Sequence, residues 1–264
     1  MGGSSLAIYS QGGASGEMFS DLLREEGVIV DPVMGTNSTR ENFILVEEDT
    51  NNQFRFGLPG DTLSDSEINQ FLSKIESLEG CEYLIASGSL PDGVPTNIYG
   101  RIGEIAKAKG IKYIVDSSKD ALQESFYHGV LLAKPNIAEL RELTNKKLES
   151  IEEQEAAAKE LILDGKVDIL VVSLGPAGAF VVTKDLSFNV HAPAVKKKST
   201  VGAGDCMVAG IVYQLSSGAS IQDAAMFGVA CGSAATLNEG ANLFTKDDVY
   251  RLYDYIRSKH KHLN

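Results

Sequence analysis

The sequence has no tryptophan, only three cysteines in 264 residues, and no apolar run that approaches the roughly 18 residues of a membrane span. An odd cysteine count in apolar or small-residue surroundings argues against a disulfide framework and favours a reducing cytosol. The four histidines stand apart from Cys81, Cys206 and Cys231, so no zinc-ligand spacing is present. Residues 1–5 lack the basic flank and long apolar stretch of a secretory signal. We therefore expect a cytoplasmic protein.

Basic residues are few relative to acidic ones, because 24 Lys and Arg against 36 Asp and Glu give a net charge of −12. A surface of this sign disfavours nucleic acids and anionic membranes as partners. It still allows a small anionic substrate whose charge is met by a few local groups. A dinucleotide-binding dehydrogenase is disfavoured on other grounds, since no GxGxxG motif follows the first expected strand.

Short apolar runs alternate with segments of helical period along most of the chain. The expected strands are Leu6–Tyr9, Tyr83–Ala86, Lys112–Val115, Val130–Ala133 and Ile169–Ser173. The expected helices between them are Gly16–Glu25, Ser66–Leu78, Thr96–Lys107, Ile137–Leu143 and Ile151–Leu163. Such alternation implies right-handed crossovers and a mostly parallel sheet covered on both faces. We expect one α/β domain over residues 1–264.

Two stretches interrupt this alternation. Asn42–Glu47 and Gln53–Phe56 are strand-like and are joined by the turn-rich residues 48–52, which predicts a hairpin. Because a hairpin between βα units does not easily join a parallel sheet, residues 40–58 are interpreted as a small lid or a dimerisation flap. The second interruption, with β-rich runs at 179–182 and 188–192, precedes three expected helices: Gly204–Leu215, Ile221–Leu237 and Lys246–Ser258.

The stretch from Ser199 to Asp205, which reads Ser-Thr-Val-Gly-Ala-Gly-Asp, carries the strongest chemical signal. Its glycines stand directly before an expected helix, where unsatisfied amides and the helix dipole favour an anion. Asp205 in the first helical turn would then accept a proton from a hydroxyl group, as a general base does. The alternative is a plain turn at Gly202 and Gly204, with Asp205 as an ordinary helix-start residue.

A second signal is the sequence Lys134-Pro135-Asn136 after an expected buried strand, with Glu139 three residues further on. Asn136 and Glu139 lie on one helical face, where they either form a capping box or help to hold Mg²⁺ and nucleotide phosphates. A third signal is the Gly-rich turn from Ser173 to Gly178, which is either an ordinary hairpin turn or a surface against which a nucleotide lies.

Together these motifs resemble the signature set of the ribokinase/PfkB carbohydrate kinases in order and in spacing. Three further phrases are similar to the phosphosugar-kinase branch of that family, which includes the minor bacterial 6-phosphofructokinase: residues 87–91, 115–118 and 232–238. The resemblance implies a ribokinase-like three-layer α/β/α fold with a small β lid. It also implies ATP-dependent phosphorylation of a sugar phosphate with Mg²⁺, with K⁺ as a further ion, and a homodimer formed through the lid.

The resemblance also implies roles for individual residues. Asp205 resembles the base, with the anion hole at Gly202, Ala203 and Gly204, and Lys134 resembles a nucleotide-phosphate contact. Asn136 and Glu139 resemble the indirect Mg²⁺ pair, and Arg40 and Ser89 resemble contacts to the sugar phosphate. The remaining implied residues are the nucleotide-ribose loop Ser173, Gly175 and Gly178, the adenine side Ser233 and Asn238, and the monovalent-cation loop Ser199, Val201, Asn238 and Gly240.

The family pattern begins with a strand that carries a sugar-binding acid, a lid strand and a Gly-Gly segment that ends in Asn. This chain enters the pattern at Gly2-Gly3, so we expect at least one βαβ unit, ~30 residues, to be absent and a sheet edge to be unpaired. The favoured acceptor is fructose 6-phosphate, which would give fructose 1,6-bisphosphate. The alternatives are tagatose 6-phosphate, fructose 1-phosphate or a nucleoside as acceptor, or an inactive fragment that binds a nucleotide or a full-length partner.

Overall fold

The computed structural model describes residues 2–47, 49–50, 52–58, 60–240 and 242–260. The chain divides into two compact units. Unit 1 contains Met1–Gly80 and Leu90–Ile98, and unit 2 contains Cys81–Ser89 and Tyr99–Asn264. The chain therefore leaves unit 2 after Ser89 and returns to it at Tyr99.

Unit 2 is built around a six-stranded sheet with the order β12-β11-β10-β9-β8-β7. In this sheet β7, β8, β9 and β10 are parallel to one another. Strand β11 is antiparallel to both of its neighbours, β10 and β12. Their bounds are β7 Tyr83–Ser87, β8 Lys112–Asp116, β9 Val130–Ala133, β10 Val167–Ser173, β11 Gly178–Thr183 and β12 Ser187–His191. Among the described strands β7 and β12 are the two edges of this sheet, because β7 pairs only with β8 and β12 only with β11.

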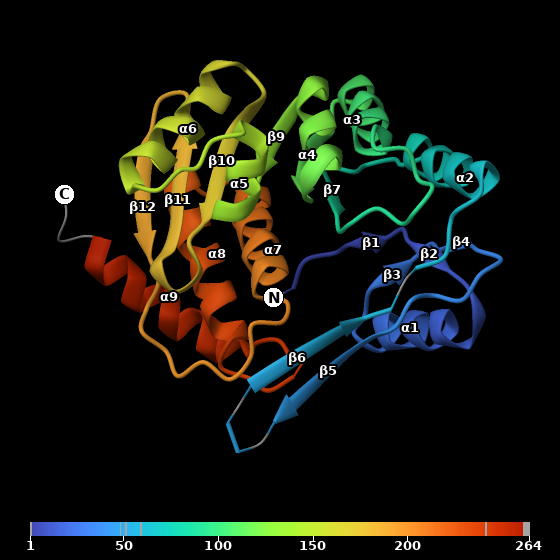
Figure 1. Ribbon diagram of the computed structural model, residues 1–264, viewed down its shortest axis with the longest axis horizontal. Coiled ribbons are helices and arrows are strands. Elements are labelled where there is room, and N and C mark those ends of the chain that lie inside the picture. The colour runs from blue at the N-terminus through green and yellow to red at the C-terminus, as the bar shows by residue number, and fades with distance from the viewer. Residues whose placement is uncertain (1, 48, 51, 59, 241, 261–264) are drawn as a thin grey trace. The chain divides into compact units, whose positions relative to one another are not determined.

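Helices cover both faces of this sheet, which confirms the expected three-layer architecture (Figure 1). One layer contains α3 Ile98–Lys109, α4 Lys119–Ser125, α5 Ile137–Thr144 and α6 Ile151–Leu163, with the short 3-10 turn η1 Phe126–His128. The other contains α7 Ala203–Ser216, α8 Ile221–Ala235 and α9 Lys246–His260. Burial of whole strands explains their apolar sequences: Val171, Val172 and Val181 are at most 1% exposed.

Helices α7 and α8 approach each other closely because glycines line their contact. A Cβ atom on Gly228 would lie 2.5 Å from Ile211 Cγ1, and one on Gly210 would lie 2.7 Å from Cys231 Sγ. A Cβ atom on Gly232 would lie 2.9 Å from the carbonyl oxygen of Ala203, the first residue of α7. Interiors packed at this density have no room for an added methyl group, so the glycines fix the position of α7.

Unit 1 contains two pairs of very short parallel strands and two helices. The expected single buried strand Leu6–Tyr9 is wrong, because β1 ends at Ala7 and Leu6 is 43% exposed. The elements are β1 Leu6–Ala7 with β3 Ile29–Val30, β2 Ser10–Gln11 with β4 Val33–Met34, α1 Gly13–Glu25 and α2 Asp65–Glu76. Two-residue strands carry no period that a sequence can show.

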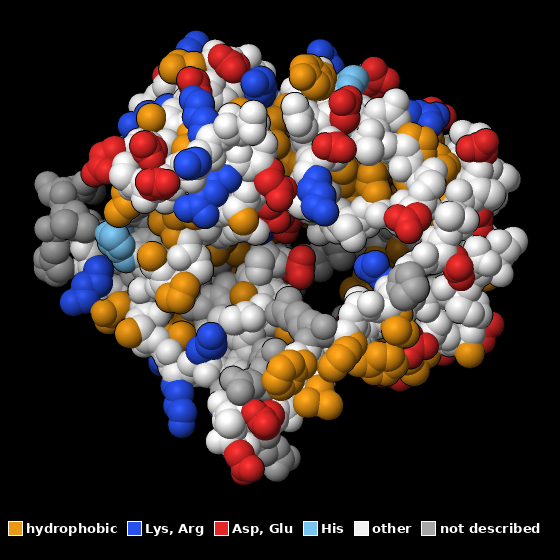
Figure 2. All heavy atoms as spheres, in the orientation of Figure 1, with side chains coloured by type: hydrophobic (Ala, Val, Ile, Leu, Met, Phe, Trp, Pro, Cys, Tyr) orange, Lys and Arg blue, Asp and Glu red, His pale blue; other side chains and the backbone are white. Residues whose placement is uncertain are grey.

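The predicted hairpin is confirmed as β5 Asn42–Glu47 paired with β6 Asn52–Gly57, although Glu48 and Asn51 of its turn lie outside the described residues. Phe43 stands opposite Phe56 and Leu45 opposite Phe54, so all four side chains lie on one face. Each of the four is 48–54% exposed, and hydrophobic side chains gather over this hairpin in Figure 2. The hairpin therefore has one apolar face that the described part of this chain leaves exposed.

No helix in the described part of the chain is long and apolar enough to cross a membrane.

Candidate active site

Helix α7 begins with an open N-terminus. Gly202 precedes it with a φ of 70°, a left-handed conformation that glycine adopts without strain, and no side chain among the described residues caps the helix. The Gly202 carbonyl already accepts the N–H of Cys206 (2.8 Å), so the helix is wound from its first turn. Asp205 lies in that turn, is exposed, and accepts no hydrogen bond from the described residues. The N–H of Ala203 donates to the carbonyl oxygen of Thr200 (3.4 Å), so among the described residues the amides of Gly202 and Gly204 and the Asp205 carboxylate are available to a ligand.

Lys134 lies against this open turn. A Cβ atom on Gly204 would be 3.2 Å from Lys134 Nζ, which places the ammonium group beside the helix start. Lys134 is only 7% exposed, and its Nζ pairs with Asp116 Oδ1 at 3.2 Å. Lys134 follows β9 and Asp116 ends β8, and the carboxyl ends of parallel strands meet at one edge of the sheet, where α/β proteins bind their ligands.

The charges of this cluster act on one another. Burial raises the pKa of Asp116, the Lys134 ammonium opposes that rise, and the carboxylate of Asp205 adds to it. Burial also raises the pKa of Glu139, while the Asn136 N–H and Lys134 oppose the rise. Perturbed carboxyl groups that share one field are typical of functional sites. The structure therefore brings Lys134, Glu139 and Asp205 together, as the hypothesis requires.

Asp116 belongs to this charged cluster, although the sequence analysis assigned no role to it. Its pairing with Lys134 joins residues 18 positions apart in the chain, and only the neighbouring positions of β8 and β9 bring them together. The available signal was an acid at the end of an expected buried strand.

Asn136 and Glu139 form the capping box that was the structural alternative for them. Asn136 Oδ1 accepts the N–H of Glu139 (3.0 Å), and Glu139 Oε2 accepts the N–H of Asn136 (2.8 Å). The cap uses Oε2 of the Glu139 carboxylate and leaves its second oxygen outside the cap. Mg²⁺ in phosphoryl-transfer enzymes is held by one or two carboxylates together with substrate phosphates, so the carboxylates of Glu139 and Asp116 fit this ion.

The Gly-rich turn after β10 lies next to the Lys-Pro-Asn turn. Ser173 N–H donates to the carbonyl oxygen of Pro135 (2.9 Å), and Asn136 and Ser173 form an isolated parallel bridge. The turn continues as the short 3-10 helix η2 Gly175–Ala177. A Cβ atom on Gly178 would lie 1.9 Å from the carbonyl oxygen of Val190, so only glycine fits there. The predicted phosphate and ribose residues are thus neighbours.

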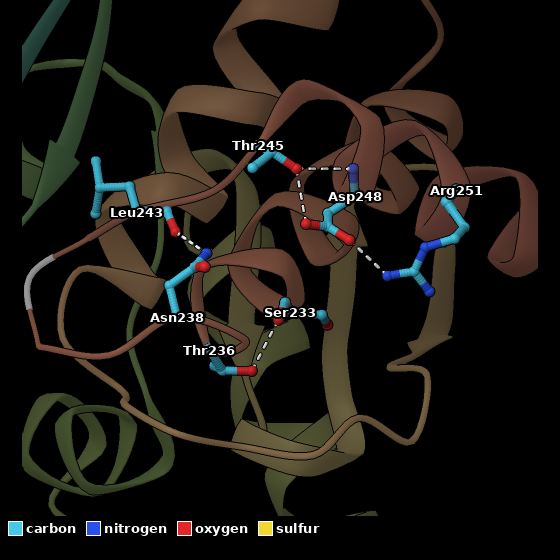
Figure 3. Close-up of polar contacts among 7 residues, drawn as sticks. All are labelled: Ser233, Thr236, Asn238, Leu243, Thr245, Asp248 and Arg251. Atoms are coloured by element: carbon cyan, nitrogen blue, oxygen red, sulfur yellow. Dashed lines mark hydrogen bonds and ion pairs between the residues drawn. The ribbon is translucent and has the colours of Figure 1, made fainter.

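The predicted adenine residues lie at the end of α8 and in the segment after it (Figure 3). The predicted cation residues lie in that segment and in the segment before α7. Asn238 Nδ2 donates to the carbonyl oxygen of Leu243, and Ser233 lies on the last turn of α8. Ser199 Oγ donates to the Gly240 carbonyl oxygen (2.9 Å) and accepts the N–H of Val201 (3.2 Å). The structure therefore brings Ser199, Val201 and Gly240 into one hydrogen-bonded group. The side-chain amide of Asn238 bridges the neighbouring loop through its bond to Leu243.

The two predicted sugar-phosphate residues lie in different units. Ser89 is exposed and follows Gly88 at the end of β7 in unit 2, where the Gly88 N–H donates to the carbonyl oxygen of Asp116 (3.0 Å). Arg40 is an exposed residue of unit 1 and makes no ion pair with the described residues.

Comparison with known proteins gives one consistent result. Residues 1–248 match the model of a protein family described as "pfkB family carbohydrate kinase". ATP-dependent 6-phosphofructokinase isozyme 2 of Escherichia coli (strain K12) is 40% identical over 257 residues, which cover 97% of this chain and 83% of that protein. The 1-phosphofructokinase of Borreliella burgdorferi is 30% identical over 258 residues, which cover 97% and 82%.

A crystal structure agrees with these relatives. Phosphofructokinase-2 from Escherichia coli in complex with potassium matches with a TM-score of 0.93 at 40% identity, and the match covers 97% of this chain and 83% of that one. The fold is therefore ribokinase-like, and the chain is an ATP-dependent sugar-phosphate kinase. It belongs to the pfkB family of carbohydrate kinases.

Proposed function

We propose that this protein transfers the terminal phosphoryl group of ATP to fructose 6-phosphate and forms fructose 1,6-bisphosphate. The observation that carries the proposal is the uncapped start of α7, with Lys134 beside Gly204 and the exposed Asp205 in the first turn. Two relatives support a phosphofructose acceptor, since one is named a 6-phosphofructokinase and the other a 1-phosphofructokinase. The second name makes fructose 1-phosphate the competing acceptor.

In this proposal the residues of α7 carry the transfer. Phosphoryl transfer depends on positioning and on neutralising charge more than on covalent chemistry by the protein. The backbone around Gly202, Ala203 and Gly204 receives the transferring group, and Lys134 adds a positive charge next to it. Asp205 orients the acceptor hydroxyl and takes its proton on a carboxylate oxygen.

The remaining residues are assigned to the nucleotide and its ions. Glu139 with Asn136, and Asp116, would hold Mg²⁺, which would supply positive charge to neutralise the nucleotide phosphates. A monovalent cation is assigned to the loop at Ser199, which agrees with the potassium in the Escherichia coli enzyme. The ribose and adenine are assigned to the backbone and side chains of Ser173, Gly175, Gly178, Ser233 and Asn238.

The sugar phosphate is assigned to Arg40 and Ser89. The guanidinium group of Arg40 is exposed, and its fork of N–H donors matches the oxygens of a phosphate. Ser89 adds a hydroxyl group at the end of β7, next in sequence to a glycine that bonds to the backbone of Asp116.

A second copy of this chain is proposed to cover the apolar face of the β5–β6 hairpin. A two-stranded hairpin is only marginally stable in water unless its apolar face is packed, and four large side chains are exposed here. The Escherichia coli enzyme has been solved in a tetrameric inhibited form, which shows that this relative self-associates. Sedimentation of Phe43→Asp should show a smaller species than the unsubstituted protein, and an unchanged mass would reject this interface.

A cytoplasmic location is part of the same proposal. Cys81, Cys206 and Cys231 are all free. Burial raises the pKa of the Cys206 and Cys231 thiols to about 11 and about 12, so both stay protonated at neutral pH. Free, unreactive thiols suit a reducing compartment.

A coupled assay of ADP release tests the function. Fructose 6-phosphate, tagatose 6-phosphate and fructose 1-phosphate are compared at equal concentration with Mg-ATP, and fructose 6-phosphate should give the largest kcat/KM. A larger value with fructose 1-phosphate would reassign the acceptor. If no sugar phosphate releases ADP while calorimetry shows Mg-ATP binding, the protein is a nucleotide-binding relative without this activity.

A further inference from the structure

The carbonyl oxygen of Gly88 is held by two hydroxyl groups. Tyr99 Oη donates to it at 2.9 Å, and Ser117 Oγ donates to it at 2.9 Å. The N–H of the same residue donates to the carbonyl oxygen of Asp116 at 3.0 Å. Both polar backbone atoms of Gly88 are therefore fixed, and its φ of 104° is a conformation that residues with a Cβ rarely adopt.

Tyr99 joins two points that lie eleven residues apart in the chain, on either side of the excursion into unit 1. Gly88 precedes Ser89, the last residue before the chain leaves unit 2, and Tyr99 is the first residue after it returns. Tyr99 is itself held, because Tyr113 Oη donates to its carbonyl oxygen (2.8 Å) and Tyr113 is 1% exposed. The hydroxyl of Tyr99 thus ties the departing segment to the returning one within unit 2.

The two donors are built into the core, while the segment that they hold faces solvent. Tyr99 and Ser117 are 8% and 7% exposed, whereas Gly88 and Ser89 are exposed. Burial raises the pKa of Tyr99 to about 12, so its hydroxyl keeps its proton and remains a donor. A buried hydroxyl group needs one hydrogen-bond partner. That need does not explain why two hydroxyl groups donate to the same carbonyl oxygen.

The end of β8 holds both Gly88 and Lys134 in place. Asp116 and Ser117 are adjacent at the end of β8: the side chain of Asp116 pairs with Lys134, and the side chain of Ser117 holds Gly88. The separation between Lys134 and the segment that carries Ser89 is therefore set by two neighbouring residues.

We propose that Tyr99 and Ser117 are positioning residues for the phosphosugar, because they clamp the Gly88 carbonyl and so fix Ser89 relative to the Asp116–Lys134 pair. The inference rests on the proposed function, in which Ser89 contacts the sugar phosphate. The clamp acts through the backbone of Gly88 and touches neither substrate.

Kinetics of Tyr99→Phe and Ser117→Ala test the role. Each change should raise KM for fructose 6-phosphate about tenfold and leave KM for ATP unchanged, as expected when one hydrogen bond of the clamp is lost. Ser117→Thr keeps a hydroxyl and should restore the unsubstituted KM. An equal rise in KM for both substrates, or no rise in either, overturns the positioning role.

Two matched controls separate positioning from stability. Tyr253→Phe removes a phenol that donates to Asp223 (3.3 Å), and Ser125→Ala removes a fully buried hydroxyl that donates to the Leu122 carbonyl (2.6 Å). Both controls should lower thermal stability about as much as the clamp variants do and leave both KM values unchanged. A rise in KM for fructose 6-phosphate in the controls would show that general loosening explains the effect.

Hydrogen exchange gives a readout that needs no activity. Backbone amides of residues 87–92 should exchange faster in Tyr99→Phe and Ser117→Ala than in the unsubstituted protein and in Tyr253→Phe. Unchanged exchange in this segment rejects the clamp itself. An unsubstituted protein that neither phosphorylates nor binds any sugar phosphate contradicts the proposed function instead, and the exchange measurement still decides whether the clamp exists.

Discussion

The first turns of α9 and α7 each carry an acid at the third helical position, and the two acids have different surroundings. In α9, Asp248 receives hydrogen bonds from Thr245 (2.7 Å) and Arg251 (2.6 Å), and its own N–H donates to Thr245 Oγ1 (3.2 Å; Figure 3). In α7, Asp205 occupies the same turn without a cap or a partner among the described residues. The acid of α9 is held by the fold, whereas the acid for which a ligand role is proposed is left open.

The two capping boxes of α2 and α5 repeat this contrast. Glu67 in α2 accepts hydrogen bonds from the N–H and hydroxyl of Ser64 (2.6 Å each) and from the N–H of Thr36 (3.0 Å), and the Ser64 hydroxyl contributes most to a lowered pKa. Glu139 in α5 accepts one backbone N–H, and burial raises its pKa. One local motif therefore gives opposite electrostatics, because the surroundings of the carboxylate differ.

The largest expected effect comes from the first-turn acids. Asp205→Asn should lower kcat by about 10²–10⁴ because the acceptor hydroxyl loses its base. Binding of ATP, measured by calorimetry, should be kept. Asp248→Asn is the matched control at the same turn of α9 and should leave kcat unchanged. Equal turnover of the Asp205 variant and the unsubstituted protein would remove Asp205 as the base.

The next effect compares the capping-box glutamates. Glu139→Gln keeps an oxygen for the cap but loses the charge offered to Mg²⁺, so kcat at low Mg²⁺ should fall about 10- to 100-fold and recover partly as Mg²⁺ is raised. Glu67→Gln should instead cost about 1–2 kcal/mol of unfolding free energy in urea with kcat unchanged. If the Glu139 variant loses only stability, its role is confined to the cap.

The smallest effect is the pH dependence of stability. The pKa of Glu67 is lowered in the folded state, so its contribution is present above its unfolded pKa and is lost as pH falls through the folded value. The pKa of Glu139 is raised, so its charged form opposes folding at neutral pH, and this penalty disappears on acidification. Between about pH 7 and about pH 4.5, the fall in Tm should be steeper in Glu139→Gln than in the unsubstituted protein, and below about pH 4.5 it should be shallower in Glu67→Gln.

The pH dependence of Tm in these two variants can also contradict the prediction. If both variants fall in parallel with the unsubstituted protein, neither carboxylate has a pKa that folding displaces. A shallower fall in both would mean that Glu139, like Glu67, is stabilised in its charged form.

Much of the fold was predictable because its elements are long or strongly patterned. The strand Val130–Ala133, the strand Asn42–Glu47 and the helix Ile151–Leu163 have the bounds that the sequence predicts. Helix α4 was missed because it has seven residues and its preceding Ser118 makes no side-chain cap. The two-residue strands of unit 1 were missed because a period needs more residues than they contain.

The site was predictable where its residues adjoin in sequence. Local spacing alone predicts that Asn136 lies with Glu139 and that Gly202 lies with Asp205. The pairing of Asp116 with Lys134 and the clamp on Gly88 depend on which strands are neighbours, and one sequence does not reveal strand order. The roles of the individual site residues remain predictions for the experiments above.

Gly232 has a consequence for how this enzyme tolerates change. It lies on α8, yet a methyl group there would meet the carbonyl of Ala203 at 2.9 Å, and Ala203 opens the helix that carries the proposed base. Replacing this buried glycine by alanine would displace the first turn of α7, which carries Asp205. It would leave every side chain assigned to a ligand unchanged. A survey that scores only side chains in contact with a ligand would rank this change as harmless, although it should lower turnover.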